Sequence, residues 1–129
     1  HGCWVLALGT NDTADVAIGS PVSRLARIEQ MMSVAHGQPV LWVNVVSLLG
    51  TGPYSEANMR LWNGALAQAC RRYPEMRVFD WATVAKTRWF INDGLRYTVD
   101  GYAARARQIA KALAMAFPAT GRSQGCVVS

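Results

Sequence analysis

The sequence of 129 residues lacks the features of several special protein classes. No apolar run approaches the ~20 residues that a membrane-spanning helix needs. The first residues also lack the charged segment, apolar segment and cleavage site of a signal peptide. If the protein is exported, its signal was therefore removed or belongs to a longer precursor. Histidine is scarce, because the chain holds only His1 and His36. General-base chemistry has few candidate side chains as a result.

Positive charge comes almost entirely from arginine, with eleven Arg, two Lys and a net charge of +5. This excess favours anionic partners in general. The charges are spread over predicted helices and do not cluster with aromatic residues, which argues against a nucleic-acid-binding protein. The length suits one domain with a buried core. We assign that domain to residues 1–117 and predict a flexible tail over 118–129, where no periodicity is present.

Three cysteines cannot all pair with one another. Cys70 falls on the apolar stripe of a predicted helix and is expected to be a buried thiol. Cys3 opens the first predicted strand and Cys126 lies in the polar tail, so these two could pair with each other or with a cysteine on a further segment. Such pairing favours an oxidising, extracytoplasmic or secreted setting.

Apolar segments rich in β-branched residues alternate with helical patterns, which predicts an α/β fold with a parallel sheet. We predict three strands, over 3–8, 39–46 and 76–81, and expect the first to be buried on both faces. Right-handed crossovers place the connecting helices on the faces of one sheet.

Helical spacing of apolar residues predicts the connecting segments. After a loop over 13–19, a helix is expected to begin at Ser20-Pro21 and to end at 35–37; further helices are expected over 55–73 and 99–117, with one turn at 82–86. In the last helix we expect one face to point inward, with Tyr102, Ala106, Ile109, Leu113 and Phe117. The opposite face is expected to point outward, with Arg105, Arg107 and Lys111.

The first predicted strand ends in Gly9-Thr10-Asn11-Asp12. Ligands of open α/β sheets bind at the carboxyl ends of the strands. Asn11 and Asp12 are therefore expected on the rim of a site, where the side-chain amide of Asn11 can donate a hydrogen bond. The alternative is that Asn-Asp only opens a loop, since both residues are common in turns.

A second motif, over residues 89–102, precedes the last predicted helix and reads Trp-Phe-Ile-Asn-Asp-Gly-Leu-Arg-Tyr-Thr-Val-Asp-Gly-Tyr. Together with Gly9-Thr10-Asn11-Asp12 it resembles the SGNH (GDSL-like) hydrolase family, which has Gly-x-Asn-Asp and, later, Asp-x-x-His followed by a Thr-x-x-Gly-Tyr helix start. The resemblance covers most of the chain and corresponds to the C-terminal portion of such a domain. It implies a three-layer, flavodoxin-like parallel sheet, of which the last three strands are present here.

The resemblance also implies roles for single residues. Asn11 matches the asparagine of the oxyanion hole and Asp93 matches the aspartate of the catalytic triad. The neighbouring residues Gly9, Asp12, Arg96 and Tyr97 are the candidate substrate-binding residues. We expect no metal and no cofactor.

Two departures from the family pattern bear on catalysis. The segments that carry the nucleophilic serine and the oxyanion glycine have no counterpart, because they would precede the first strand. Arg96 stands where the family has histidine, and an arginine stays protonated and cannot act as a general base near neutral pH.

Other serines and histidines are poor substitutes for these missing groups. His1 and His36 are expected at the amino end of the sheet, about a strand length of ~17–20 Å from the motifs. Ser47 and Ser55 are expected on the ligand side, but as a loop residue and a helix cap, and a serine without a base is a poor nucleophile.

Arg96 has three interpretations. It could pair with Asp93 and hold the loop shut, it could bind an anionic group of a substrate, or the base could come from a segment outside this sequence. Nearby aromatic residues could form an apolar or sugar-stacking wall or could simply pack in the core; they are Tyr54, Trp89, Phe90 and Tyr97.

Two functions follow. The first is an SGNH-like ester hydrolase or acyltransferase acting on acyl esters of carbohydrate or lipid, incomplete in this chain. The second is a catalytically silent module that binds an envelope glycan, an acyl ligand or a partner subunit. Because an unpaired apolar edge is a liability in a sheet, we expect an N-terminal fragment of the same precursor or a second chain to cover the strand from Cys3 to Leu8.

Overall fold

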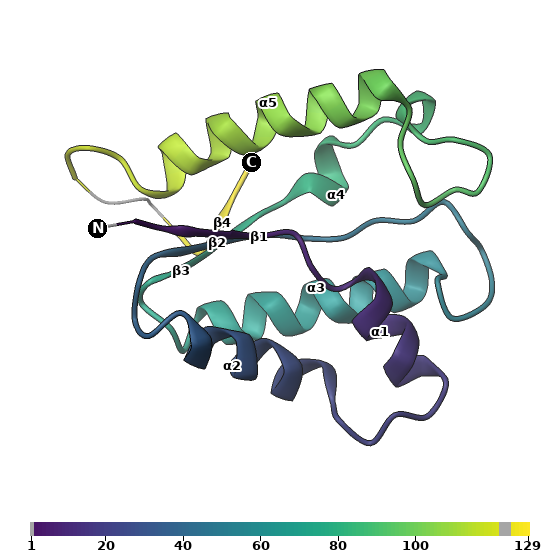
Figure 1. Ribbon diagram of the computed structural model, residues 1–129, viewed down its shortest axis with the longest axis horizontal. Coiled ribbons are helices and arrows are strands. Elements are labelled where there is room, and N and C mark those ends of the chain that lie inside the picture. Colours follow the sequence, from purple (N-terminus) through teal and green to yellow (C-terminus); the bar gives the residue numbers. More distant parts are fainter. Residues whose placement is uncertain (1, 122–124) are drawn as a thin grey trace.

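The computed structural model describes residues 2–121 and 125–129 and forms three layers around one parallel sheet (Figure 1). The sheet has the strand order β1-β2-β3-β4 and all its described pairs are parallel. The strands are β1 (Trp4–Leu6), β2 (Val40–Val43), β3 (Met76–Phe79) and β4 (Val127–Val128). The predicted α/β class with a parallel sheet is therefore confirmed.

Helices cover both faces of this sheet (Figure 1). One face carries α1 (Thr10–Ala17), α2 (Arg24–Val34) and α3 (Glu56–Cys70). The other face carries α4 (Trp81–Val84) and α5 (Val99–Ala116), which a 3₁₀ turn over Thr87–Trp89 connects. Ser23, Ser55 and Thr98 cap α2, α3 and α5, because each side chain accepts a hydrogen bond from a backbone N–H in the first turn.

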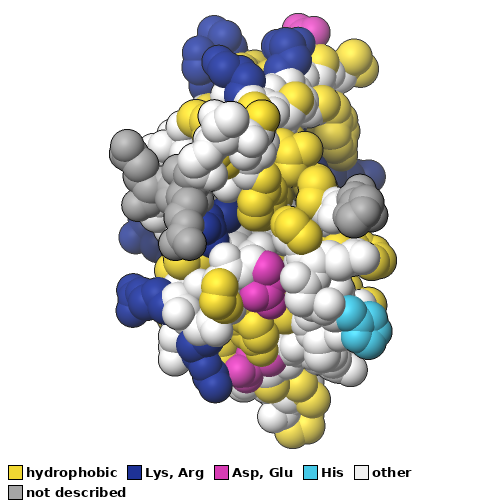
Figure 2. Space-filling model, turned by 90° about the vertical axis from the view of Figure 1, so that its left-hand side faces the viewer, with side chains coloured by type: hydrophobic (Ala, Val, Ile, Leu, Met, Phe, Trp, Pro, Cys, Tyr) yellow, Lys and Arg dark blue, Asp and Glu magenta, His cyan; other side chains and the backbone are white. Residues whose placement is uncertain are grey.

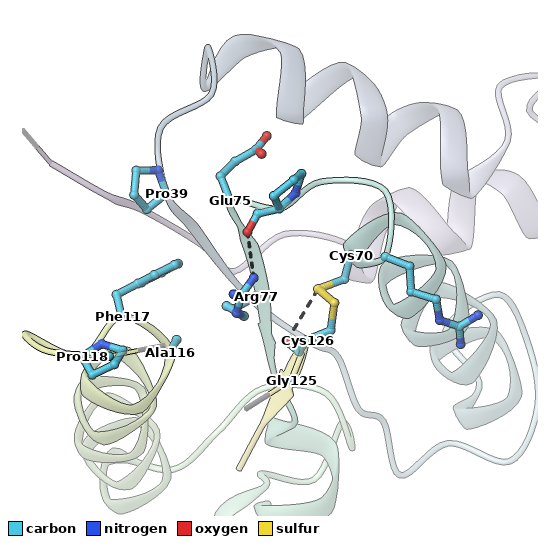
Figure 3. A pocket seen from close by; sticks show the side chains of 12 residues that line it. Pro39, Cys70, Glu75, Arg77, Ala116, Phe117, Pro118, Gly125 and Cys126 are labelled. Atoms are coloured by element: carbon cyan, nitrogen blue, oxygen red, sulfur yellow. Dashed lines mark hydrogen bonds between the residues drawn. A yellow bond between two sulfur atoms is a disulfide. The ribbon is translucent and has the colours of Figure 1, made fainter. Parts of the chain in front are cut away.

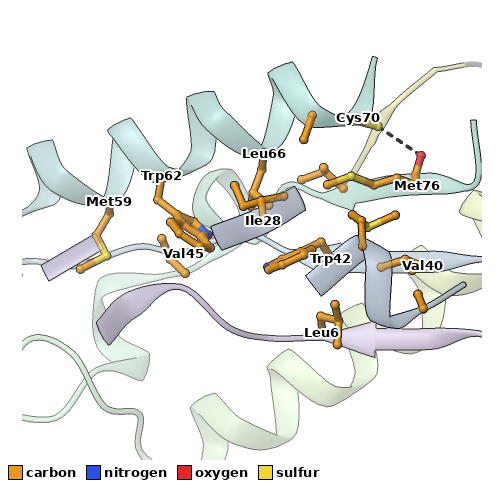
Figure 4. Packing of buried hydrophobic residues seen from close by; sticks show 14 residues of the cluster. Leu6, Ile28, Val40, Trp42, Val45, Met59, Trp62, Leu66, Cys70 and Met76 are labelled. Atoms are coloured by element: carbon orange, nitrogen blue, oxygen red, sulfur yellow. Dashed lines mark hydrogen bonds between the residues drawn. The ribbon is translucent and has the colours of Figure 1, made fainter. Parts of the chain in front are cut away.

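The alternation of side chains along the central strands divides the core into two clusters. Val40 and Trp42 of β2 pack against α2 and α3, and Figure 4 shows Trp42 facing Trp62 of α3 there. Leu41 and Val43 of the same strand pack against α4 and α5. All four are fully buried, so β2 is the centre of the fold as its unbroken apolar run predicts.

The first strand differs from its prediction. β1 pairs only with β2 among the described strands, so its other edge is open. Trp4 is 41% and Val5 42% exposed, and the expectation of burial on both faces is wrong. Leu6 alone reaches the core. An apolar run indicates a strand, but whether both faces are covered depends on neighbours that the run does not encode.

The segment predicted as a loop over 13–19 is mostly helix, since α1 occupies Thr10–Ala17. Its residues are largely polar, so hydrophobic spacing could not reveal it. Contacts with other helices stabilise it instead: the Thr13 hydroxyl donates to the carbonyl of Asn58, and Arg24 donates to Thr13. The next helix begins three residues later than predicted, at Arg24, because Ser23 and not Ser20 is its cap.

Part of the predicted C-terminal tail forms a strand. Val127 and Val128 form β4 beside β3, which makes four strands where the sequence predicts three. A disulfide joins Cys126 to Cys70 at the end of α3, and Cys3 is free and exposed. Cys126 therefore pairs neither with Cys3 nor with a cysteine on a further segment, the two alternatives that the sequence left open. Cys70 is buried as predicted, but as half of a disulfide.

The crossover from β3 to β4 is left-handed. The helices between β1, β2 and β3 lie on one face, whereas α5, between β3 and β4, lies on the other face while the strand order keeps its direction. The last crossover therefore has the opposite hand to the first two, and left-handed crossovers are rare. The predicted inward face of α5 is confirmed in part. Ile109, Leu113 and Phe117 pack against the core beside the buried Ala112, whereas Tyr102 and Ala106 are exposed.

Candidate functional site

A cleft of about 420 Å³ lies at the carboxyl end of the sheet and contains most of the residues that the motifs predict. The first turn of α1 contributes Thr10 and Asn11, the segment after β2 contributes residues 44–46, and the second motif contributes residues 93 and 95–97. Asn11, Asp93, Arg96 and Tyr97 therefore share one cavity although two of the motif segments are more than eighty residues apart.

The start of α1 places Asn11 at this cleft. Gly9 precedes the helix with a φ of 139°, and a Cβ there would overlap the buried indole of Trp62. The side chain of Asn11 accepts a hydrogen bond of 2.8 Å from the Tyr54 hydroxyl through its Oδ1. This bond leaves the Nδ2 donors of Asn11 available to a ligand.

The second motif forms a tight hydrogen-bonded loop around Asp93. Oδ1 of Asp93 accepts from the backbone N–H groups of Leu95 and Arg96, each at 2.9 Å, and Oδ2 accepts from Nε of Arg96 at 2.7 Å. Gly94 takes the left-handed conformation, with a φ of 70°, that the turn requires. Of the three interpretations of Arg96, the structure contains the one in which it pairs with Asp93 and closes the loop.

These bonds fix the charge of Asp93. The hydrogen bond from the Arg96 side chain, followed by those from the two backbone N–H groups, lowers the pKa of Asp93 from 3.8 to about 2. Asp93 in turn raises the pKa of Arg96. The carboxylate is therefore ionised at neutral pH, and its three hydrogen bonds are made within its own loop.

Tyr97 forms part of the cleft wall and is held by other aromatic residues. Its hydroxyl accepts a 2.8 Å hydrogen bond from the indole of Trp81, and its ring contacts those of Phe90 and Tyr102. Burial raises the pKa of Tyr97 in spite of the opposing effect of the Trp81 hydrogen bond. Trp89 stacks on Trp81 and lies outside the cleft, so of the four predicted wall residues only Tyr54 and Tyr97 line it.

Two polar residues of α5 line the cleft without having been predicted as site residues. Arg105 and Tyr102 lie in the first turns of α5, and both line the cavity. The Arg105 guanidinium lies over the Tyr97 ring, 5.5 Å from its centroid, and its Nε is buried without a hydrogen-bond partner. The expectation that Arg105 points outward is wrong. The spacing of three residues between Tyr102, the last residue of the second motif, and Arg105 is the sequence signal that could have indicated a shared helix face.

Two predicted binding residues do not line the cavity. Gly9 packs against Trp62, and Asp12 forms an ion pair of 3.1 Å with Arg27 of α2. Asn44 does line the cavity, but its side chain is occupied: it donates to Asp80 and accepts from the backbone N–H of Ala82. This buried amide joins the end of β2 to the start of α4, the structural role that its position in the predicted strand 39–46 suggests.

No serine or histidine of the described residues lines the cleft. Ser47 accepts from the N–H of Leu49, and Ser55 caps α3, which are the structural roles predicted for both. His36 follows α2 at the amino end of the sheet, and His1 lies outside the described residues. Among residues 2–121 and 125–129, no group of three or more His, Cys, Asp or Glu side chains is gathered that could hold a metal ion.

A larger hollow, of about 660 Å³, lies at the opposite, amino end of the sheet. Figure 2 shows this face, where hydrophobic side chains lie among basic and acidic ones, and Figure 3 shows the Cys70–Cys126 disulfide, Glu75 and Arg77 among the groups that line the hollow. We place the candidate site in the smaller cleft, because ligands of parallel α/β sheets bind at the carboxyl ends of the strands and because both motifs meet there.

Comparisons with protein-family models, with curated proteins and with solved structures give no match to this chain. In the part of the chain that the structure describes, no helix combines the length and the apolar character that crossing a membrane requires. Function is therefore inferred from the cleft itself.

Proposed function

We propose that this chain is an SGNH-like module whose cleft binds an acyl ester of a carbohydrate or lipid without hydrolysing it by its own residues. The observation that carries this proposal is the closed Asp93–Arg96 pair inside a cleft that retains a free amide donor on Asn11. A triad needs a nucleophile, a base and a group that orients the base. Here the orienting carboxylate is bonded to a cation that cannot accept a proton.

The remaining cleft groups suit binding of a carbonyl oxygen. The Tyr54 hydroxyl fixes the amide of Asn11 by donating to its Oδ1, so the Nδ2 group is directed by an existing hydrogen bond. An oriented amide can donate to the carbonyl oxygen of a bound ester, as it would to an oxyanion in an active relative. Tyr54 and Tyr102 supply aromatic surface on the same cavity, which suits a sugar ring or an acyl chain.

Binding and hydrolysis can be measured together with a simple probe. We expect methyl 6-O-acetyl-glucoside to shift the side-chain amide resonances of Asn11 in NMR spectra of the labelled protein, with no acetate released above the buffer rate. The Asn11→Asp variant removes the amide donor and should weaken binding roughly 10-fold, the worth of one hydrogen bond of about 1 kcal/mol or slightly more. Gln30→Glu, the same chemical change on the exposed face of α2, should leave binding unchanged.

Two results would contradict the proposal. Acetate release catalysed by the purified chain would mean that its own residues complete a catalytic site. If the probe shifts the Asn11 resonances of the folded protein no more than it shifts those of surface residues outside the cleft, the cleft is not the ester site.

A second candidate function is a hydrolase or acyltransferase completed by another polypeptide segment. The open edge of β1 favours it, because Trp4 and Val5 are exposed beside a strand that pairs on one side only. An N-terminal fragment of the same precursor or a second chain would cover this edge and would bring the serine and the base. The Cys70–Cys126 disulfide supports an oxidising compartment for either function.

Native mass spectrometry of the purified protein, followed by the same sample denatured, separates the two candidates. A second polypeptide that appears on denaturation, together with esterase activity of the complex, would favour the completed enzyme. A single 129-residue species without activity would favour the silent module.

A further inference from the structure

Arg105 is the unpaired charge of the cleft. Its Nε is buried without a hydrogen-bond partner, and no carboxylate of the described residues forms an ion pair with its guanidinium. A charged donor that is removed from water without a partner destabilises a protein, so such groups are rare unless a ligand or water satisfies them. The position of Arg105 on a cavity wall makes a ligand the natural acceptor.

Among the described residues that line the cleft, Asp93 is the one with an acidic side chain, and it does not compensate this charge. All three hydrogen bonds of the Asp93 carboxylate are made to Leu95 and Arg96 within the loop. Asp93 and Arg96 therefore form a neutral pair, and the charge of Arg105 gives the cavity a net positive charge. The Nη groups of Arg96 stay available as well, because its ion pair uses Nε and its side chain is 73% exposed.

The surroundings of Arg105 hold its guanidinium in place. It lies over the ring of Tyr97, which is itself fixed by the hydrogen bond from Trp81. A cation over an aromatic face is oriented and keeps its N–H groups free at the edge of the guanidinium plane. Across the cavity, the first turn of α1 presents Thr10 and Asn11, at the positive end of a helix.

We propose that the ligand of this cleft carries a carboxylate or phosphate group, which Arg105 binds with the help of Arg96. The inference rests on the proposed ester-binding function and narrows its ligand to an anionic glycan or lipid headgroup. Planar guanidinium groups bind both anions through paired hydrogen bonds. Carboxylate and phosphate sources share this chemistry and are separated below.

The test compares three sugars that differ in charge at one position. We expect methyl glucuronide or glucose 6-phosphate to bind in calorimetry roughly 10- to 100-fold more tightly than neutral methyl glucoside, as one charge-assisted contact to a partly buried arginine implies. The preferred probe identifies the anion. Arg105→Gln should remove this preference, and Arg105→Lys, which keeps the charge, should retain part of it. Lys111→Gln removes one positive charge from an exposed position of the same helix and should leave the preference unchanged.

Equal affinity for the three sugars in the folded protein would overturn the inference. So would an anionic preference that survives in Arg105→Gln, since another group would then bind the anion. Circular dichroism of each variant shows that it is folded. Binding of methyl 6-O-acetyl-glucoside is measured separately. If that neutral ester binds while the anionic sugars show no preference, the anion site fails and the ester site does not.

Discussion

The disulfide between Cys70 and Cys126 gives the most quantitative prediction. It joins the end of α3 to the start of β4 across 56 residues of sequence, with the two Cα atoms 5.9 Å apart. Closing a loop of this length restricts the unfolded chain, and the chain-entropy relation converts it to about 4 kcal/mol of stability. For a domain of this size, such a loss lowers the melting temperature by roughly 10–20 °C.

The comparison is made in a Cys3→Ser background, which removes the free thiol. Adding Cys126→Ser should lower the free energy of unfolding in urea titrations by about 4 kcal/mol, because Cys70 then returns to a buried thiol that the core tolerates. Cys3→Ser alone is the matched control and should change little, since Cys3 is exposed and unpaired. Reducing agent should reproduce the loss in the wild-type protein.

Hydrogen exchange shows which backbone amides lose protection when the disulfide is removed. β4 makes only a short hydrogen-bonded ladder with β3. In it the backbone N–H groups of Val78 and Asp80 donate to the carbonyls of Cys126 and Val128, each at 2.8 Å. Bonds of this kind are worth about 1 kcal/mol each, and a two-residue strand makes too few of them to stay in place alone. Both amides should lose protection without the disulfide. A loss of stability below about 1 kcal/mol, with both amides still protected, would refute the reasoning.

Two further predictions concern the motifs. Gly9→Ala should destabilise the protein by about 2–5 kcal/mol in urea unfolding, because a Cβ at a φ of 139° meets the buried Trp62. The control Gly64→Ala, in an open position of α3, should change the free energy of unfolding by less than about 1 kcal/mol. Equal effects of the two substitutions would contradict the packing role of Gly9. The side chain of Asp93 should titrate with a pKa of about 2 in NMR. The stability that its charge supplies is therefore present above its ordinary pKa of 3.8 and is lost as the pH falls through about 2. Arg96→Gln should move the midpoint of the Asp93 titration toward 3.8, and an unchanged midpoint would show that Arg96 does not cause the low pKa.

The sequence predicts those elements whose residues follow a hydrophobic period. β2 and α3 were predicted because Leu41 and Trp42 lie in an unbroken apolar run, and because Met59, Trp62 and Leu66 recur at helical spacing. α1 was missed because its stability comes from Thr13 and from its contacts with α2 and α3, which no local pattern encodes. β4 was missed for a similar reason, since the covalent bond at Cys126 holds two residues that would not form a strand alone.

The sequence predicts part of the candidate site, namely the meeting of Asn11 with the loop of Asp93. Parallel strands bring their carboxyl ends to one edge, so Asn11 and Asp93 could be expected to meet without knowledge of any contact. The pairing of Asp93 with Arg96 is local and was among the predicted alternatives. Arg105 was not predicted, because whether a helical arginine faces solvent or a cavity depends on how α5 is rotated against the sheet. That rotation is set by Ala104 and Ala112, whose small side chains give only a weak hydrophobic signal.

The position of β4 also determines how this sheet can grow. At one end, β1 presents an unpaired edge, and at the other end β3 is covered by a strand of only two residues. Short edge strands are one way in which proteins prevent further pairing. With β4 in place, the sheet has a single extensible edge, which permits an assembly of limited size. Without it, a second copy could add its β1 to the exposed β3, and each addition would leave a new edge open, as in a head-to-tail filament. The bond at Cys126 therefore keeps in place the short strand that covers β3, in addition to its effect on the stability of one chain.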